Sequence, residues 1–119
     1  MDLFKMSVSP AHILDTFSIL QIKNRNNLPV DNEITILIGE AMEQIGQRRF
    51  LDILSSAEYE RLLNINEKIF HLVDKAAKDE VKASEIAEAN NMRFKYKKEL
   101  QQKFFNSTPL EAKSNDSTQ

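Results

Sequence analysis

Apolar residues recur at intervals of three or four positions along most of the chain, which is the spacing of amphipathic α-helices. Ser9-Pro10 has the form of an N-cap followed by proline at the first helical position, so a first helix is predicted from there to about Asn24. Its apolar residues lie around most of the circumference: Ile13, Leu14, Phe17, Ile19, Leu20 and Ile22. A helix that is apolar on nearly all sides is usually buried, so we expect this one at the centre of the fold.

A second helix is predicted after the loop that contains Pro29. Asp31 or Asn32 is expected to cap its start, and the periodic apolar positions continue to about Arg49. Gly46 is expected to weaken the last turn of this helix. Residues 50–54 then form a short apolar connector, for which a helix is one option.

Two longer helices complete the pattern. Ser55 or Ser56 is expected to cap the third, which continues to about Lys78, and the fourth is predicted from near Asp79 to near Phe105. The inner face of the third helix is predicted to carry Tyr59, Leu62, Leu63, Ile69, Phe70, Val73, Ala76 and Ala77. The inner face of the fourth is predicted to carry Ala83, Ile86, Ala87, Phe94, Leu100 and Phe104.

The predicted fold class is therefore all-α, with one helical domain over residues 9–105, an N-terminal extension over 1–8 and a flexible, disordered tail over 106–119. Four helices joined by short loops suit either an antiparallel four-helix bundle or a long helical hairpin that carries two smaller helices. The chain contains only two glycines and three prolines, which is too few for the many tight turns of an all-β protein.

Composition and charge exclude several classes of function. The chain has no cysteine, which excludes disulfides, a thiol nucleophile and cysteine-ligated zinc. Its formal net charge of −2 argues against a general nucleic-acid binder, although cations crowd residues 93–103, where they suit either a helix C-terminus or an anion-binding face. No stretch resembles a signal peptide or a membrane span, so a cytoplasmic protein without membrane contact is expected. Neither a Gly-rich phosphate loop nor a hydrolase or zinc-protease motif occurs.

Polar residues stand at several positions where the periodicity predicts a core residue. Asn66 interrupts the apolar stripe of the third predicted helix, and Asn90, Arg93 and Lys97 interrupt that of the fourth. Burying such groups without partners is costly, so each of them needs one. The simplest partners lie within the same set: Asp15 and Asp74 with Arg93 and Lys97, and Asn66 with Asn90.

Such a network would fix the register of the helices. The first alternative is a polar pocket between helices that holds a small anionic or polar ligand, and the second is simple exposure to solvent. Each histidine also lies three residues before an aspartate, in His12-x-x-Asp15 and His71-x-x-Asp74, and facing pairs of this kind can ligate a divalent metal. Because the same spacing is common on solvated helix faces, we expect neither a metal ion nor a cofactor.

Three blocks of sequence carry a family resemblance. They are ILDTFSILQIK at residues 13–23, INEKIFHLVD at 65–74 and NNMRFKYK at 90–97. In this order they resemble a family of small helical proteins of unknown function that occur in bacteria and sometimes in phages, often near polysaccharide or glycosyltransferase genes. The resemblance covers about Val8 to Phe105.

The resemblance implies a site of eight residues, either a ligand-binding site or a buried structural network. These residues are Asp15, Ser18, Lys23, Asn66, Asp74, Asn90, Arg93 and Lys97. Four further positions depart from the family by replacing acids: His12, His71, Val73 and Asn91. If the family site were a carboxylate metal site, this chain would have lost several of its ligands. The resemblance implies no reaction.

The expected function is a non-enzymatic helical interaction or oligomerisation module, which acts as a homo-oligomer, with a dimer favoured, or docks on a protein partner. The long third and fourth helices and the small core favour this function. Two alternatives stay open: a small enzyme or ligand-binding protein for a phosphorylated or sugar-nucleotide compound, and a phage or virion accessory protein. In the first alternative, the anion would be held by Lys23, Arg93 and Lys97, and the base or metal ligands would be Asp15 and Asp74.

Overall fold

The computed structural model describes residues 9–78 and 82–105, and it is all-α, as the sequence predicted. Its helices are α2 (Pro10–Arg25), α3 (Asp31–Gln44), α4 (Gln47–Leu54), α5 (Ala57–Ala76) and α6 (Ala83–Phe105). The predicted N-terminal extension and the predicted tail lie outside the described residues. No helix in the described part combines the length and the apolar composition that a bilayer span needs.

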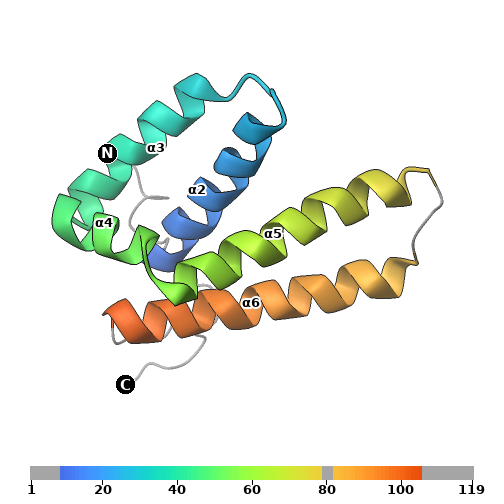
Figure 1. The fold of residues 1–119 in the computed structure, drawn as a ribbon. Helices are drawn as coiled ribbons and strands as arrows, with labels where there is room; N and C mark the ends of the chain where they lie inside the picture. Colours follow the sequence, from blue (N-terminus) through green and yellow to red (C-terminus); the bar gives the residue numbers. More distant parts are fainter. Residues whose placement is uncertain (1–8, 79–81, 106–119) are drawn as a thin grey trace.

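The two longest helices, α5 and α6, form an antiparallel hairpin that runs the length of the molecule (Figure 1). Helix α2 packs across one end of this hairpin and contacts both of its helices. Helix α3 packs on the other side of α2, and the short α4 links α3 to α5. Of the two predicted arrangements, the structure therefore has the long hairpin with smaller helices packed on it.

The core forms around α2, as the sequence predicted. Ser9 caps this helix by accepting a hydrogen bond from the backbone N–H of His12 at 3.4 Å, and Pro10 follows at the first helical position. Eight residues of α2 are buried: Ala11, Ile13, Leu14, Asp15, Phe17, Ser18, Leu20 and Ile22. The other helices contribute core residues that include Ala41, Phe50, Ile53, Tyr59, Leu62 and Leu100. Helix α2 is thus surrounded by the rest of the fold.

Tyr59 is the one polar-tipped aromatic residue in this core cluster. Its hydroxyl donates a hydrogen bond to Gln21 Oε1 on α2, so the buried polar tip is satisfied. Burial raises the pKa of the Tyr59 hydroxyl above its ordinary value, because the phenolate would lose its hydration. Tyr59 therefore remains neutral over the physiological range and serves the packing of α5 against α2.

The second predicted helix is divided in two, so the predicted end at Arg49 is wrong. Helix α3 ends at Gln44, and Gly46 separates it from α4 with a φ of +95°. That left-handed backbone conformation is accessible to glycine at little cost, which lets the chain turn there. At the other end, Val30 rather than Asp31 or Asn32 occupies the N-cap, so Asp31 becomes the first helical residue. The helix boundaries at Ser56 and Ala76 lie close to the prediction.

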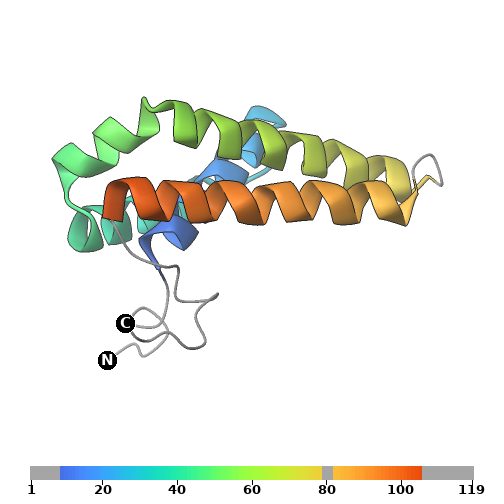
Figure 2. The same ribbon diagram turned by 90° about the horizontal axis from the view of Figure 1, so that it is seen from below.

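The inner faces predicted for the two long helices are only partly covered. Val73 exposes 53% of its surface and Phe94 exposes 47%, and Ala83 and Ala87 are exposed as well. Figure 2 shows that the hairpin extends well beyond α2, so α2 covers only part of its length. Placing Val73 and Phe94 in a continuous core was therefore wrong.

The hairpin is also joined by an ion pair whose effect depends on pH. Glu58, in the first turn of α5, accepts a hydrogen bond from Lys103 Nζ of α6 at 3.0 Å, and this hydrogen bond lowers the pKa of the Glu58 carboxyl. A carboxyl with a lower pKa in the folded state than in the unfolded state contributes stability above its unfolded pKa and loses it as the pH falls through its folded pKa. Because Glu58 is near the surface, we expect Glu58→Gln to lower the free energy of unfolding by only about 0.5 kcal/mol at neutral pH.

That difference is expected to shrink as the pH falls through the folded-state pKa of Glu58, because the carboxyl is then protonated in the folded state as well. Urea unfolding followed by circular dichroism at neutral pH and at a series of acidic pH values measures it. Glu60→Gln is the control, because Glu60 lies in the same first turn but is exposed. Equal losses for the two variants, or a Glu58→Gln loss that does not shrink as the pH falls, would contradict the assignment.

Candidate functional site

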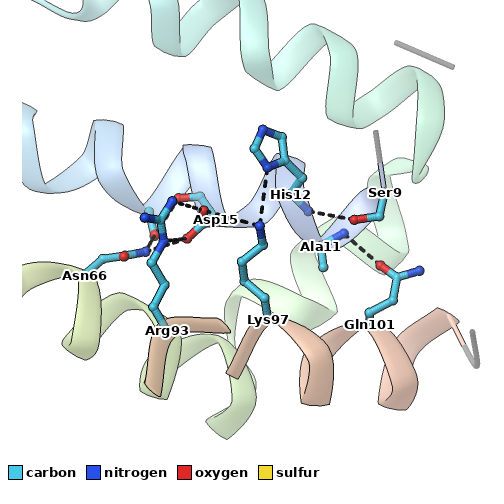
Figure 3. A network of polar contacts seen from close by, with 9 residues as sticks. Ser9, Ala11, His12, Asp15, Asn66, Arg93, Lys97 and Gln101 are labelled. Atoms are coloured by element: carbon cyan, nitrogen blue, oxygen red, sulfur yellow. Dashed lines mark hydrogen bonds and ion pairs between the residues drawn. The ribbon is translucent and has the colours of Figure 1, made fainter. Parts of the chain in front are cut away.

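A buried carboxylate lies at the centre of the candidate site. The Asp15 side chain, on α2, is 0% exposed. Arg93 of α6 binds it with two nitrogens, Nε to Oδ1 at 3.1 Å and Nη2 to Oδ2 at 2.5 Å. Lys97 Nζ, one turn further along α6, lies 3.8 Å from Oδ2. One carboxylate of α2 is therefore held by two cations of α6 (Figure 3).

Helix α5 completes this arrangement through Asn66, which is 4% exposed. Its Nδ2 donates to Asp15 Oδ1 at 2.8 Å and to Ser18 Oγ at 2.7 Å. Ser18 Oγ in turn donates to the backbone carbonyl of Asp15 at 2.7 Å. We call the five residues Asp15, Ser18, Asn66, Arg93 and Lys97 the Asp15 clamp, since they join α2, α5 and α6.

The negative charge of Asp15 is compensated within the protein. A buried carboxylate is tolerated only when it is paired and hydrogen-bonded, and both oxygens of Asp15 have such partners. The hydrogen bond to Asp15 raises the pKa of Arg93, against the opposing effect of partial burial. A carboxylate that is fully buried and bonded on both oxygens is poorly placed to act as a base or to bind a metal ion.

Two residues that sequence reasoning did not assign to the network extend it toward the start of α2. His12 Nδ1 lies 3.4 Å from Lys97 Nζ, and Gln101 Oε1 accepts a hydrogen bond from the backbone N–H of Ala11 at 2.9 Å (Figure 3). Gln101 therefore satisfies one of the backbone donors that every helix start leaves without an intrahelical partner. The signal was present, because Gln101 follows Lys97 by four positions and continues the stripe of Arg93 and Lys97.

Three of the eight predicted site residues lie outside the clamp: Lys23, Asp74 and Asn90. Asp74 is exposed and pairs with Lys78 at 3.5 Å, so it does not bind Arg93 or Lys97 as expected. Asn90 is exposed and donates to the backbone carbonyl of Ile86 at 3.2 Å, so the expected pair with Asn66 is not formed. On α6 the buried position is that of Ala89, one residue earlier, and Asn90 is rotated out of the stripe by about 100°.

A cavity of about 440 Å³ lies beside the clamp, between α2 and α5. We call it the α2–α5 notch. Its walls are apolar and consist of Ile19, Ile69, Phe70 and Val73. Its polar lining consists of Lys23, Asn66, Asp74 and Arg93, so two residues of the clamp form part of its surface. Two of the predicted site residues outside the clamp, Lys23 and Asp74, thus line the notch.

The histidines occupy different surroundings. His12 contacts Lys97, whereas the His71 ring packs edge-on against Phe70 with 5.5 Å between ring centroids. Residues 9–78 and 82–105 contain no cluster of three or more His, Asp or Glu side chains that could hold a metal ion.

Comparisons of the chain with family models, with curated proteins and with solved structures found no match in any of the three. The resemblance carried by residues 13–23, 65–74 and 90–97 therefore stays a prediction. Each of these three blocks supplies at least one residue of the Asp15 clamp.

Proposed function

We propose that this chain is a non-enzymatic helical module that associates, through α3, with a second copy of itself or with a protein partner. The observation that carries the proposal is the exposure of Ile36 on the side of α3 opposite its packed residues. Ile36 is 70% exposed, whereas Ala41 of the same helix is buried and Ile34 and Leu37 pack against the core.

The position of α3 supports this reading. It lies at the edge of the fold and packs against α2 and α4, and its outer face is left to solvent (Figure 1). Single exposed apolar residues are common on proteins, but Ile36 lies in the middle of a helix and opposite the side that contacts α2. Covering this face with a second helix would remove its apolar surface from water.

The Asp15 clamp supports the non-enzymatic part of the proposal. Both oxygens of Asp15 are engaged by groups of α5 and α6, and a buried network of this kind would fix the register of α2 against the α5–α6 hairpin. The alternative of a phosphorylated or sugar-nucleotide ligand required Lys23, Arg93 and Lys97 to converge on an anion. Arg93 and Lys97 instead bind Asp15, which leaves that alternative with less support.

Size-exclusion chromatography with light scattering tests the proposal. We expect the wild-type chain to have the mass of a dimer and Ile36→Gln to shift it toward the monomer. Leu51→Gln is the matched control, because Leu51 is 53% exposed but lies on α4. A monomeric wild type from which no partner is recovered in an Ile36-dependent pull-down would contradict the proposal, as would equal effects of the two substitutions.

A further inference from the structure

The α2–α5 notch has the dimensions and the lining of a small-molecule site. Its volume of about 440 Å³ lies within the range of ligand pockets, roughly 300–1,000 Å³. Its walls are apolar side chains from two helices, Ile19 on α2 and Ile69, Phe70 and Val73 on α5. Val73 lies in it with 53% of its surface exposed, so the apolar surface is open to an occupant.

Lys23 supplies the charge. It lines the notch and is half-buried, and no ion pair or side-chain hydrogen bond involves its ammonium group within residues 9–78 and 82–105. The other charges of the notch are already engaged, since Arg93 is bound to Asp15 and Asp74 is paired with Lys78. A half-buried cation beside apolar walls favours an anion that brings its own apolar body.

The same charges limit the anion to one negative charge. Lys23 can neutralise one, whereas the Asp74 carboxylate at the notch would repel a second. Arg93 offers little compensation because two of its nitrogens are bound to Asp15. A nucleotide or a polyphosphate therefore fits poorly, and an apolar molecule with a single carboxylate fits well.

We propose that the α2–α5 notch binds a small amphiphilic monocarboxylate, whose apolar chain lies on Ile19, Ile69, Phe70 and Val73 and whose carboxylate pairs with Lys23. This site is separate from the α3 surface, so it does not depend on the association proposed above. The Asp15 clamp acts as a positioning element, because Asn66 and Arg93 hold the floor of the notch in place.

The test is an NMR titration of the full chain with dodecanoate, with uncharged dodecanol as the matched probe. We expect dodecanoate to give saturable shifts of backbone amides at Lys23, Ile69 and Val73, and to bind about tenfold more tightly than dodecanol, which is the effect of one charge-assisted contact. Lys23→Gln is expected to remove this preference, so that both probes bind with similar affinity. Lys75→Gln, at an exposed position of α5, is expected to leave the preference unchanged.

A second pair of variants tests whether the apolar walls of the α2–α5 notch contact the ligand. Val73→Gln is expected to weaken both probes several-fold, whereas Leu51→Gln, which has the same exposed fraction of 53%, is expected to change neither. The proposal is overturned if dodecanoate gives no saturable shifts, if its shifts map to α3, or if the preference over dodecanol survives Lys23→Gln in a folded protein. It is also overturned if Val73→Gln dissociates a dimer, because a second copy then covers the notch.

Discussion

Replacing Asp15 by alanine is expected to lower the free energy of unfolding by about 3–5 kcal/mol. The substitution leaves Arg93 and Lys97 without their carboxylate partner, and it removes the acceptor of one Asn66 hydrogen bond. Breaking a buried ion pair by removing one partner is costly because the remaining charge has lost its hydration without compensation. A domain of this size has a total stability of about 5–15 kcal/mol, so the variant is expected to be marginal or unfolded.

Urea unfolding followed by circular dichroism measures the loss, and Lys97→Met is the matched comparison. Lys97→Met removes one of the two cations but leaves Asp15 with both bonds from Arg93 and with the bond from Asn66. We therefore expect it to cost less than about 1.5 kcal/mol. Similar small losses for the two variants would show that Asp15 contributes little to stability and that the network is not structural.

The second large effect is expected for Phe50→Ala. Phe50, on α4, is 2% exposed, and its ring packs edge-on against Phe17 of α2 with 5.4 Å between centroids. Truncating a buried phenylalanine removes its transfer free energy and leaves a cavity, for a loss of about 3–5 kcal/mol. The midpoint of thermal unfolding is expected to fall by more than about 10 °C.

Differential scanning calorimetry of Phe50→Ala and Phe94→Ala separates burial from residue type. Phe94 is 47% exposed on α6, so its truncation is expected to cost less than about 1 kcal/mol. Equal losses in the free energy of unfolding for the two variants would show that the packing of Phe50 against α2 stabilises the fold no more than the exposed Phe94 does.

Much of the fold could be predicted because its signals are local. Ser9-Pro10 and Ser56 mark the starts of α2 and α5, and the apolar circumference of α2 predicted its central place. The break at Gly46 could not be predicted, because periodicity continues through it and a glycine is compatible with both a helix and a turn. The exposure of Val73 and Phe94 depends on where α2 ends relative to the hairpin, which is a property of tertiary packing.

The sequence predicted which residues belong to the candidate site better than it predicted which of them are in contact. Asp15, Arg93 and Lys97 were expected to meet, and the structure brings them together because buried charges need partners. Asn90 and Asp74 were expected in the same network, but a shift of one residue on a helix turns a side chain by about 100°. Sequence spacing alone therefore does not show whether a polar residue beside the apolar face of a helix points into the core or into solvent. The notch was not predicted as an apolar cavity, because its walls come from both α2 and α5. No local sequence pattern specifies how two helices are placed relative to each other.

Asp15 and Arg93 lie far apart in the sequence. This separation affects the order in which the helices can pack while the chain is being synthesised. Helix α2 is synthesised early, whereas Arg93, which neutralises Asp15, lies 78 residues further along. Until α6 has been made, α2 can dock on α5 only by burying a carboxylate whose one partner there is the neutral Asn66, and such burial is unfavourable. We therefore expect Asp15 to stay in water until α6 can supply Arg93 and Lys97, and α2 to enter the core only then.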